Sequence, residues 1–307
     1  MSIVVVGSLN MDFVVQVERL PAPGETVLGR DFKMIPGGKG ANQACAAGRL
    51  AGAATPVHMA GRVGYDPFAD HLKASLAAAG VNVARVHATQ AQPTGVALIW
   101  VEKSGQNSIV VASGANMALE PSSVKGLFDG ARLALFQLES PLDAVLAGLR
   151  SARAAGARTV LDPAPAQPLS DEVLACVDLL TPNESEACIL LGETPRPVGL
   201  DSAPAMARRL RARGAAAVIL KLGAQGCYYD GPAGSFESPG FSVDPVDATA
   251  AGDTFNAALA VALAEGREMP AALRFANAAA AISVTRLGAQ ASAPARAEVD
   301  AFLAARA

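Results

Sequence analysis

The stretch Asp247-Ala-Thr-Ala-Ala-Gly-Asp-Thr-Phe255 combines small residues with a carboxylate where a helix, expected over 253–264, should begin. The N–H groups of Ala251, Gly252 and Asp253 would be free at the positive end of this helix and could bind an anion. Gly252 has no Cβ, so a phosphate could approach the backbone closely. Asp253 could take a proton from a hydroxyl group while these N–H groups stabilise a migrating phosphoryl group. A helix-capping role explains the same aspartate equally well.

A second glycine-rich turn, Gly37-Gly-Lys-Gly-Ala-Asn-Gln43, leads into an Ala-rich segment of helical character. Its Lys39 and Asn42 offer a charged and a neutral donor beside backbone without bulky side chains. A turn that is merely flexible is the alternative interpretation.

Asn10 and Asp12 lie two residues apart on chain that is expected to be extended, so both side chains face the same side. An amide beside a carboxylate suits vicinal hydroxyl groups, because each hydroxyl is both donor and acceptor. Taken alone, the two residues are also typical of turns.

Three polar or glycine positions follow directly after expected strands, where open α/β sheets bind ligands: Glu139, Asn183 and Gly223. In Thr181-Pro-Asn-Glu-Ser-Glu186, Asn183 could bond a phosphate and Glu186 could hold a hydrated Mg²⁺. A capped helix with an acidic first turn explains this segment as well. The segment 221–226 reads as a strand that ends in a glycine turn, which is a weak signal by itself.

Composition excludes several classes of function. Of the 307 residues 51% are hydrophobic and 17% charged, and the net charge of −3 gives no reason to expect a nucleic-acid partner. The chain contains no Walker-type phosphate loop and no G-x-G-x-x-G motif, and its scattered cysteines indicate neither a zinc site nor a disulfide framework. The amino terminus enters a Val-rich strand without a basic region, and no uncharged apolar run reaches membrane-spanning length. We therefore expect a cytoplasmic protein without membrane partners.

The elements that must position these residues alternate along the chain. Strands are expected at 3–6, 133–138, 159–162, 178–181 and 218–222, and helices at 184–191 and 203–213. Asp66 followed by Pro67 predicts a helix start, and Ser140-Pro141 another. This alternation predicts an α/β fold with a largely parallel sheet that is covered by helices on both faces.

Two regions break the alternation. Residues 94–101 and 108–112, separated by Lys103 to Asn107, predict a hairpin, and Phe13 to Ile35 reads as further extended chain. We expect a single domain over 1–307 whose small β-sheet lid comprises about 11–35 and 94–112.

With these residues in place, the chain closely resembles the ribokinase family of carbohydrate kinases over nearly its whole length. The likeness rests on the motifs GSLNMD, GGKGANQ, QLESP, DPAPA, TPNE, AAGDTFN and TRLGAQ. AAGDTF is specific for the family of sugar and nucleoside kinases, and GGKGANQ with LNMD points within it to kinases of ribose. The resemblance implies a three-layer α/β/α fold with a β lid, and a homodimer formed through the lids.

The resemblance also implies roles for individual residues. Asp253 matches the catalytic base, beside Gly252 and Ala251. The sugar-contacting positions are Asn10, Asp12, Gly38, Lys39, Asn42, Glu139 and Asp253. The ATP-contacting positions are Asn183, Lys221, Gly223, Ala224, Gln225, Gly226, Gly252 and Asn277. Family members are activated by K⁺, whose site matches Asp247, Thr249, Ser283, Arg286, Gly288 and Ser292.

The chain departs from the family pattern near the nucleotide. Lys221 stands where threonine is frequent, Asn277 where histidine is frequent, and Ala257 where glycine is usual. These departures bear on nucleotide preference more than on the reaction.

The resulting expectation is ATP-dependent phosphorylation of D-ribose at O5, with Mg²⁺ and K⁺ as cofactors. One alternative is a kinase of the same fold that acts on another sugar or on a nucleoside. Another is a non-catalytic sugar-binding sensor. The polar residues Asn10, Asp12 and Lys39 favour a free sugar, and the intact Gly252-Asp253 pair argues against a sensor.

Overall fold

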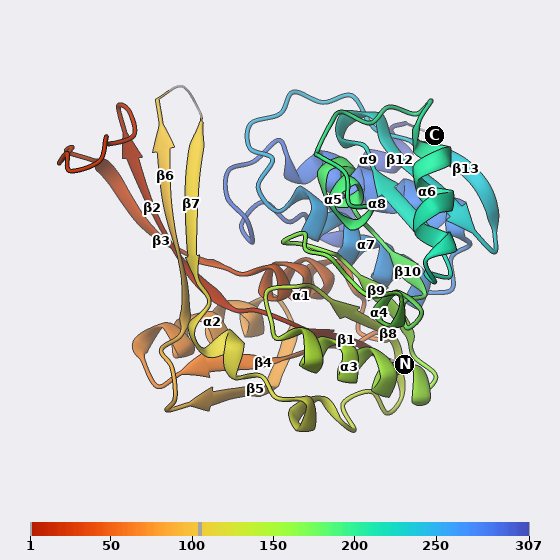
Figure 1. Cartoon of the computed structure of the whole chain (residues 1–307), viewed down its shortest axis with the longest axis horizontal. Helices are drawn as coiled ribbons and strands as arrows, with labels where there is room; N and C mark the ends of the chain where they lie inside the picture. Colours follow the sequence, from red (N-terminus) through yellow and green to blue (C-terminus); the bar gives the residue numbers. More distant parts are fainter. Residues whose placement is uncertain (1, 104–105, 307) are drawn as a thin grey trace.

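A large sheet forms the centre of the computed structural model, which describes residues 2–103 and 106–306 (Figure 1). Within those residues nine strands follow the order β13-β12-β11-β10-β9-β8-β1-β4-β5. Their bounds are β1 Ser2–Val6, β4 Val57–Gly64, β5 Val81–Thr89, β8 Ala131–Phe136, β9 Arg158–Leu161, β10 Leu179–Leu180, β11 Val218–Lys221, β12 Gly226–Gly231 and β13 Gly234–Pro239.

The pairing of these strands confirms the predicted, largely parallel sheet. Every neighbouring pair from β5 to β11 is parallel, whereas β11–β12 and β12–β13 are antiparallel. Because parallel strands all point one way, their carboxyl ends meet at one edge of the sheet, which is where ligands bind in such folds.

Helices cover both faces of this sheet and so make the three layers that were expected. One apolar core contains Ile3 and Val5 of β1, and the other contains Val4 and Val6, as the alternation of side chains along a strand requires. The first core is covered by α1 Lys39–Leu50, α2 Pro67–Ala78, α7 Ala251–Ala264, α8 Met269–Ser283 and α9 Arg296–Ala304. The second is covered by α3 Leu142–Ala154, α4 Asp171–Leu174, α5 Glu184–Leu190 and α6 Ala203–Ala212.

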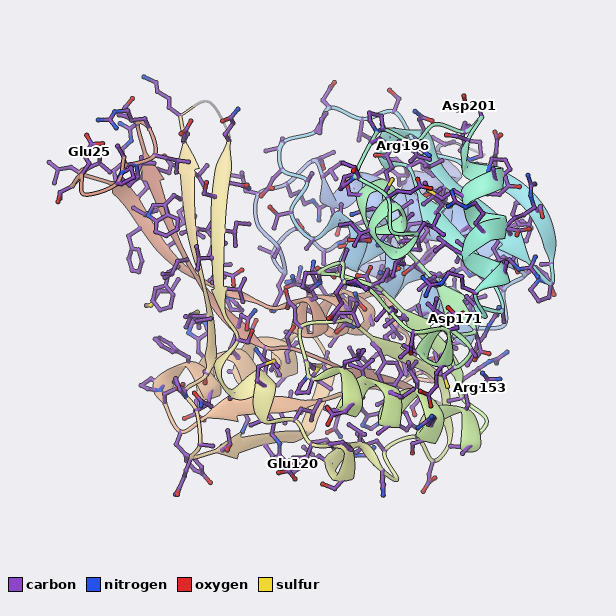
Figure 2. The ribbon with its side chains drawn as sticks, in the orientation of Figure 1. Glu25, Glu120, Arg153, Asp171, Arg196 and Asp201 are labelled. Atoms are coloured by element: carbon purple, nitrogen blue, oxygen red, sulfur yellow. The ribbon has the colours of Figure 1, made fainter. Side chains whose placement is uncertain are left out.

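A second, smaller sheet projects from the main body (Figure 1). Its order is β3-β2-β6-β7, with bounds β2 Asn10–Val17, β3 Arg30–Gly37, β6 Gly95–Glu102 and β7 Asn107–Ala112. The predicted hairpin is confirmed, because β6 and β7 pair antiparallel; residues 104 and 105 of its expected connection lie outside the described residues. Glu25, between β2 and β3, lies at the outer tip (Figure 2).

Helix starts agree with the sequence at one place and differ at two. The Asp66 side chain accepts from Ala69 N at 3.2 Å and caps α2, as predicted. Helix α3 begins after Pro141, and the buried Ser140 hydroxyl does not cap it. Helix α7 begins at Ala251, earlier than predicted, because Ala250 adopts the left-handed conformation that turns the chain into the helix. In the described part of the chain, no helix combines the length and apolarity needed to cross a membrane.

Candidate active site

The carboxylate of Asp253 lies on the first turn of α7 and is 5% exposed. Its Oδ2 accepts from Asn42 Nδ2 at 3.1 Å and its Oδ1 from Gln43 Nε2 at 3.0 Å. Both donors come from α1, which packs along α7. Asp253 also lines a cavity of about 390 Å³. The carboxylate is therefore fixed in orientation and still faces open space.

The start of α7 offers donors to an anion, with one correction. Ala251 N donates to Ala248 O at 3.2 Å, so its N–H is not free as predicted: the turn before the helix uses it. The N–H groups of Gly252 and Asp253 have no protein partner among the residues that the structure describes. Ala250 has φ 58°, which is strained for a residue with a Cβ. The cavity that Asp253 lines also borders Gly252.

The environment of Asp253 raises the pKa of its carboxyl group to about 6. Burial is the largest cause, and the negative charge of Asp162 adds to it. The Lys39 ammonium and the amides of Gln43 and Asn42 act in the opposite direction. A base whose pKa lies near neutrality is suited to accept a proton from an alcohol during a reaction.

Lys39 supplies positive charge to the same cavity. Burial by itself lowers the pKa of this ammonium, but the carboxylates of Asp253, Asp162, Glu139 and Glu186 raise it more, so the pKa lies above its ordinary value. Lys39 therefore stays charged beside Asp253.

Residues predicted to contact a sugar lie near the place where the small sheet meets the main body, at the start of β2 and the end of β3; we call this place the root of the small sheet. Glu139 Oε2 accepts from Ser8 Oγ at 2.5 Å and from Lys39 N at 3.1 Å, which joins the end of β8 to the glycine-rich turn. Gly38, in this turn, has φ 89°. Asn10 Oδ1 accepts from Asn116 Nδ2 at 2.7 Å.

Asp12 lies over Gly37, where a Cβ would stand 2.1 Å from Asp12 Oδ2, so a larger residue at position 37 would displace the carboxylate. Burial and the neighbouring charge of Glu139 raise the pKa of Asp12 to about 7. The carboxylates of Asp12 and Glu139 therefore lie near enough to influence each other, and both can accept hydrogen bonds from the hydroxyl groups of a ligand.

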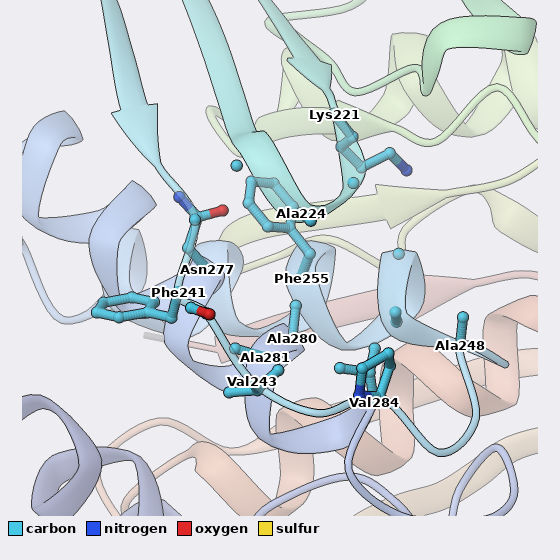
Figure 3. Close-up of a pocket in the computed structure, with 17 residues that line it drawn as sticks. Lys221, Ala224, Phe241, Val243, Ala248, Phe255, Asn277, Ala280, Ala281 and Val284 are labelled. Atoms are coloured by element: carbon cyan, nitrogen blue, oxygen red, sulfur yellow. The ribbon is translucent and has the colours of Figure 1, made fainter. Parts of the chain in front are cut away.

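A second cavity, of about 370 Å³, adjoins the first and is mainly apolar (Figure 3). Lys221, Gly223, Ala248, Ala251 and Gly252 line both cavities. The remaining lining residues are Ala224, Gly226, Gly240, Phe241, Ser242, Val243, Pro245, Phe255, Asn277, Ala280, Ala281 and Val284. A flat apolar ring with a polar tail reaching toward Gly252 would suit this pair of cavities.

Asn277 is the main polar side chain at the far end of this second cavity (Figure 3). Its Nδ2 donates to Ser238 O at 3.0 Å, Ser238 Oγ at 3.1 Å and Pro239 O at 3.1 Å. Two of these acceptors are backbone carbonyls, so a flipped amide would set oxygen against oxygen. The Oδ1 atom consequently faces the cavity as an acceptor.

One predicted nucleotide contact fits less well than the others, and a second also caps a helix. Gln225 lines neither cavity, because its backbone closes a turn (N to Leu222 O at 3.1 Å) that leaves the side chain exposed. Asn183 and Glu186 border the first cavity and form a capping box in which Glu186 Oε2 accepts from Asn183 N at 2.7 Å. The capped-helix interpretation of this segment is thus correct, and the carboxylate keeps lone pairs for a further ligand.

The residues matched to a K⁺ site come from two segments, the loop before α7 (residues 247–249) and the end of α8 with the stretch after it (residues 283–292). Asp247 accepts from Thr249 N and Gly288 N, both at 2.9 Å, and donates from its own N to Val284 O at 3.1 Å. Ser283 and Ser292 turn their hydroxyls to carbonyls of their own segments. The Arg286 guanidinium pairs with Glu298, so Arg286 could contribute only its backbone carbonyl.

Comparisons with known proteins identify the family of this chain. The chain matches the family model described as pfkB family carbohydrate kinase over residues 1–296. The chain belongs to this family. A ribokinase of Haemophilus influenzae is 41% identical over 307 residues, which cover 98% of each chain.

Solved structures of pfkB relatives share the whole fold. A ribokinase from Thermotoga maritima has a TM-score of 0.90 at 37% identity, with 99% of each chain covered. An Arabidopsis thaliana ribokinase complexed with ribose and ATP has a TM-score of 0.89 at 33% identity, with 98% of each chain covered. The resemblance inferred from the motifs is confirmed.

Four residues of this pfkB site were missed as site residues in the sequence. Ser8, Gln43 and Asp162 lie inside the recognised motifs, and the motifs were the signal that could have identified them. Asn116 lies in a short 3-10 helix outside every motif, and only its contact with Asn10 reveals it.

Proposed function

We propose that the protein transfers the terminal phosphoryl group of ATP to O5 of D-ribose. The observation that carries the proposal is the placement of Asp253: two amides hold its carboxylate, and it faces a cavity beside the unpaired N–H of Gly252. A base next to an anion-binding helix start is what phosphoryl transfer to an alcohol requires. The ribokinase names of the relatives support the same reaction.

Ribose is held in this proposal at the root of the small sheet. Asn10, Asp12, Gly38, Lys39, Asn42 and Glu139 are the contacting residues. The carboxylates of Asp12 and Glu139 accept from sugar hydroxyls, while Asn42 donates from the neighbourhood of Asp253. Such contacts fix the sugar so that O5 meets the base, which accounts for much of the rate enhancement in reactions of this type.

ATP occupies the apolar cavity and extends to Gly252. The adenine ring lies between Phe241, Val243 and Val284, with Asn277 at its edge. The phosphates extend along the residues at the end of β11 and the following turn: Lys221, Gly223, Ala224 and Gly226. Asn183 borders the cavity on the phosphate side. The N–H groups of Gly252 and Asp253 receive the phosphoryl group that is transferred.

In the reaction itself, Asp253 accepts the proton of the O5 hydroxyl as O5 forms a bond to the γ-phosphorus. The bond from that phosphorus to the bridging oxygen breaks, and ADP leaves with the electron pair. The helix N–H groups and the lysine ammoniums stabilise the oxygens that carry charge during the transfer.

Mg²⁺ fits the chemistry of the first cavity. Carboxylate oxygens are preferred partners of Mg²⁺ and of its bound waters, and Glu186 and Asp253 line this cavity. Glu186 would hold such an ion through water. The bound ion would supply charge neutralisation on the phosphates.

K⁺ fits the loop around Asp247. Burial raises the pKa of Asp247, but the donors of Thr249 and Gly288 lower it more, so the carboxylate stays ionised. Thr249, Ser283, Arg286, Gly288 and Ser292 would add oxygen ligands, mostly backbone carbonyls, of the kind that replace the hydration shell of K⁺. Bound there, K⁺ would order the loop that leads into α7.

We also propose that the chain acts as one unit, that the small sheet closes over the sugar as a lid, and that two chains associate through their lids. Met34, Phe13, Leu98 and Val110 lie in one cross-strand row on the face opposite to Asp12. Met34, Leu98 and Val110 are 51%, 43% and 55% exposed, which favours a partner on that face. A cytoplasmic location accords with ATP as the substrate.

The decisive experiment replaces the proposed base. Asp253→Asn should lower kcat for ribose about 10²- to 10⁴-fold, the usual contribution of a positioned base. Asp171→Asn, which changes an exposed carboxylate outside both cavities, is the control and should keep wild-type rates. Turnover near the wild-type level in Asp253→Asn, with a normal melting temperature, would exclude the role.

A panel of pentoses, hexoses and nucleosides tests the acceptor. Ribose should have the highest kcat/KM. A preference for a hexose or a nucleoside would indicate a kinase of the same fold that acts on that acceptor. If no compound of the panel leads to ATP turnover, the non-catalytic sensor is favoured.

A further inference from the structure

Lys221 occupies an unusual place at the end of β11. Its Nζ lies 2.9 Å from Asp162 Oδ1, and the two side chains are 13% and 3% exposed. Lys221 lines both cavities, and a Cβ added to Gly252 would stand 3.3 Å from Nζ. Figure 3 shows the ammonium directed away from Asn277 and Phe241. The ammonium therefore lies at the junction of the two cavities, beside the anion-binding start of α7.

The ammonium has donors to spare. Lys carries three N–H donors, and within residues 2–103 and 106–306 Asp162 is the sole hydrogen-bond acceptor of Lys221 Nζ. A buried ion pair recovers its desolvation cost only when its remaining donors are satisfied. The nearby carboxylates raise the pKa of Lys221 more than its burial lowers it, so the group is a permanent cation.

Asp162 connects this cation to the proposed base. Its Oδ2 accepts from Gln43 Nε2 at 3.0 Å, and the same nitrogen donates to Asp253 Oδ1 at 3.0 Å. Gln43 Oε1 accepts from Gln137 Nε2 at 2.7 Å, which fixes the orientation of the amide. The order Lys221, Asp162, Gln43, Asp253 is thus a continuous polar chain from the nucleotide cavity to the acceptor side.

We propose that Lys221 binds the γ-phosphoryl group of ATP through its two free N–H donors, and that Asp162 is the positioning residue that holds the ammonium there. The proposal rests on the proposed function and adds to it a fixed cation at the group being transferred. During the transfer O5 gains the bond to phosphorus, ADP takes the electron pair of the broken bond, and the O5 proton goes to Asp253. Lys221 neither gains nor loses a proton.

Nucleotide binding tests the contact directly, by calorimetry with a non-hydrolysable ATP analogue and with ADP. In Lys221→Met the Kd of the analogue should rise at least about 10-fold, while the Kd of ADP, which lacks the γ-phosphoryl group, should stay within about 3-fold. The kcat should fall about 10²- to 10³-fold, as when one donor to a developing charge is removed. Equal losses for the analogue and ADP would overturn the assignment to the γ-phosphoryl group.

The variant Asp162→Asn tests whether Asp162 positions the Lys221 ammonium or only stabilises the fold. Because the Asp162 charge raises the pKa of Asp253, its removal should move the acid limb of the kcat profile to lower pH, and kcat should fall less than in Lys221→Met. An unmoved limb with unchanged kcat would show that Asp162 does not position the ammonium.

Arg211→Met is the matched control, since it removes a cation from the buried Asp230, and neither residue lines the two cavities. It should lower the melting temperature and leave nucleotide affinities unchanged. If Lys221→Met behaves in the same way, the pair is only structural and the proposal fails. Because one unpaired buried charge can prevent folding, the double variant Lys221→Met/Asp162→Asn is measured too and should show the same selective loss for the analogue.

Failure of the proposed function would look different. A wild-type protein that binds the ATP analogue but phosphorylates no ribose would refute that function, while the comparison of the analogue with ADP would still decide the role of Lys221.

Discussion

At the scale of residues, the first cavity brings opposite charges into one enclosed space. Asp253, Asp162 and Glu186 border it together with the ammoniums of Lys39 and Lys221. Each lysine is held charged by the carboxylates, and Asp253 has a pKa raised mainly by burial. Glu184 lines the cavity as well, so four carboxylates face two ammoniums, and an anionic ligand would bind at the lysines and at the helix N–H groups.

Asp12 makes a prediction about stability and pH. Its pKa of about 7 in the folded protein exceeds the ordinary value of 3.8, so the folded state binds a proton more tightly than the unfolded state. The stabilisation is complete below about pH 4 and is lost as the pH rises through 7. Asp12→Asn should therefore melt at a higher temperature than the wild type at pH 8 and not at pH 4. Melting curves that differ equally at both pH values would contradict this, and Asp143→Asn, an exposed carboxylate on α3, serves as control.

Asn277 makes a prediction about the nucleotide. Its Oδ1 is a fixed acceptor at the edge of the second cavity, so it should accept from the 6-amino group of adenine and disfavour the 6-oxo group of hypoxanthine. We expect kcat/KM to be about 10-fold higher for ATP than for ITP, and Asn277→Ala to remove most of that ratio.

Ser238→Ala is the matched control, because it deletes one acceptor of Asn277 Nδ2 and leaves the two carbonyls that orient the amide. It should keep the preference for ATP. If 2′-deoxy-ATP is discriminated and ITP is not, Oδ1 contacts the ribose of the nucleotide instead.

The extent to which the site could be predicted is clearest at the scale of elements. Asp253, Lys39 and Asn183 lie at ends of helices, where the sequence marks both the residue type and the change of backbone, and all three line the first cavity. Gln43 lies inside α1, where a polar residue looks like any other until α7 packs against it. The prediction of a free N–H at Ala251 was wrong for a related reason. The preceding turn, which uses this N–H, depends on the left-handed conformation of Ala250, and an alanine does not indicate that conformation in a sequence.

The loop from Asp247 to α7, with the segment after α8, makes a prediction about monovalent cations. Because the loop leads directly into the helix start that is proposed to receive the phosphoryl group, an ion that orders the loop should raise activity. Rates in K⁺ buffer should clearly exceed those in Na⁺ buffer at the same ionic strength. Asp247→Asn should reduce that difference, and equal wild-type rates in both buffers would remove the case for the site.

At the scale of the whole molecule, the alternation of strands and helices predicted the parallel sheet and its two helical layers correctly. The antiparallel edge of β12 and β13 was not predicted, since both strands begin with glycine, β13 ends in proline, and β12 follows a glycine turn that resembles a loop. Some polar residues meet only because distant segments pack together, as Asn10 of β2 and Asn116 of the short 3-10 helix do, and the sequence pattern does not contain such contacts.

The projecting sheet makes a prediction about assembly. If the apolar row of Leu98 and Val110 forms a lid-to-lid contact, the wild type should have about twice the 31.1 kDa mass of one chain by light scattering. Leu98→Glu should then yield monomers. Tyr65→Glu, which alters an exposed aromatic on the main body, should leave the mass unchanged. A monomeric wild type would refute the contact.

The root of the projecting sheet has a mechanical consequence. The Asn116 side chain accepts from Leu9 N and donates to Leu9 O and to Asn10 Oδ1. These hydrogen bonds fix strand β2 at its first residue. Asp12 stands two residues further out, on the part of the strand that leaves the main body. A sugar that contacted both Asn10 and Asp12 would connect the fixed first residue of β2 to the outer part of the strand, so that sugar binding would also restrict the orientation of the small sheet.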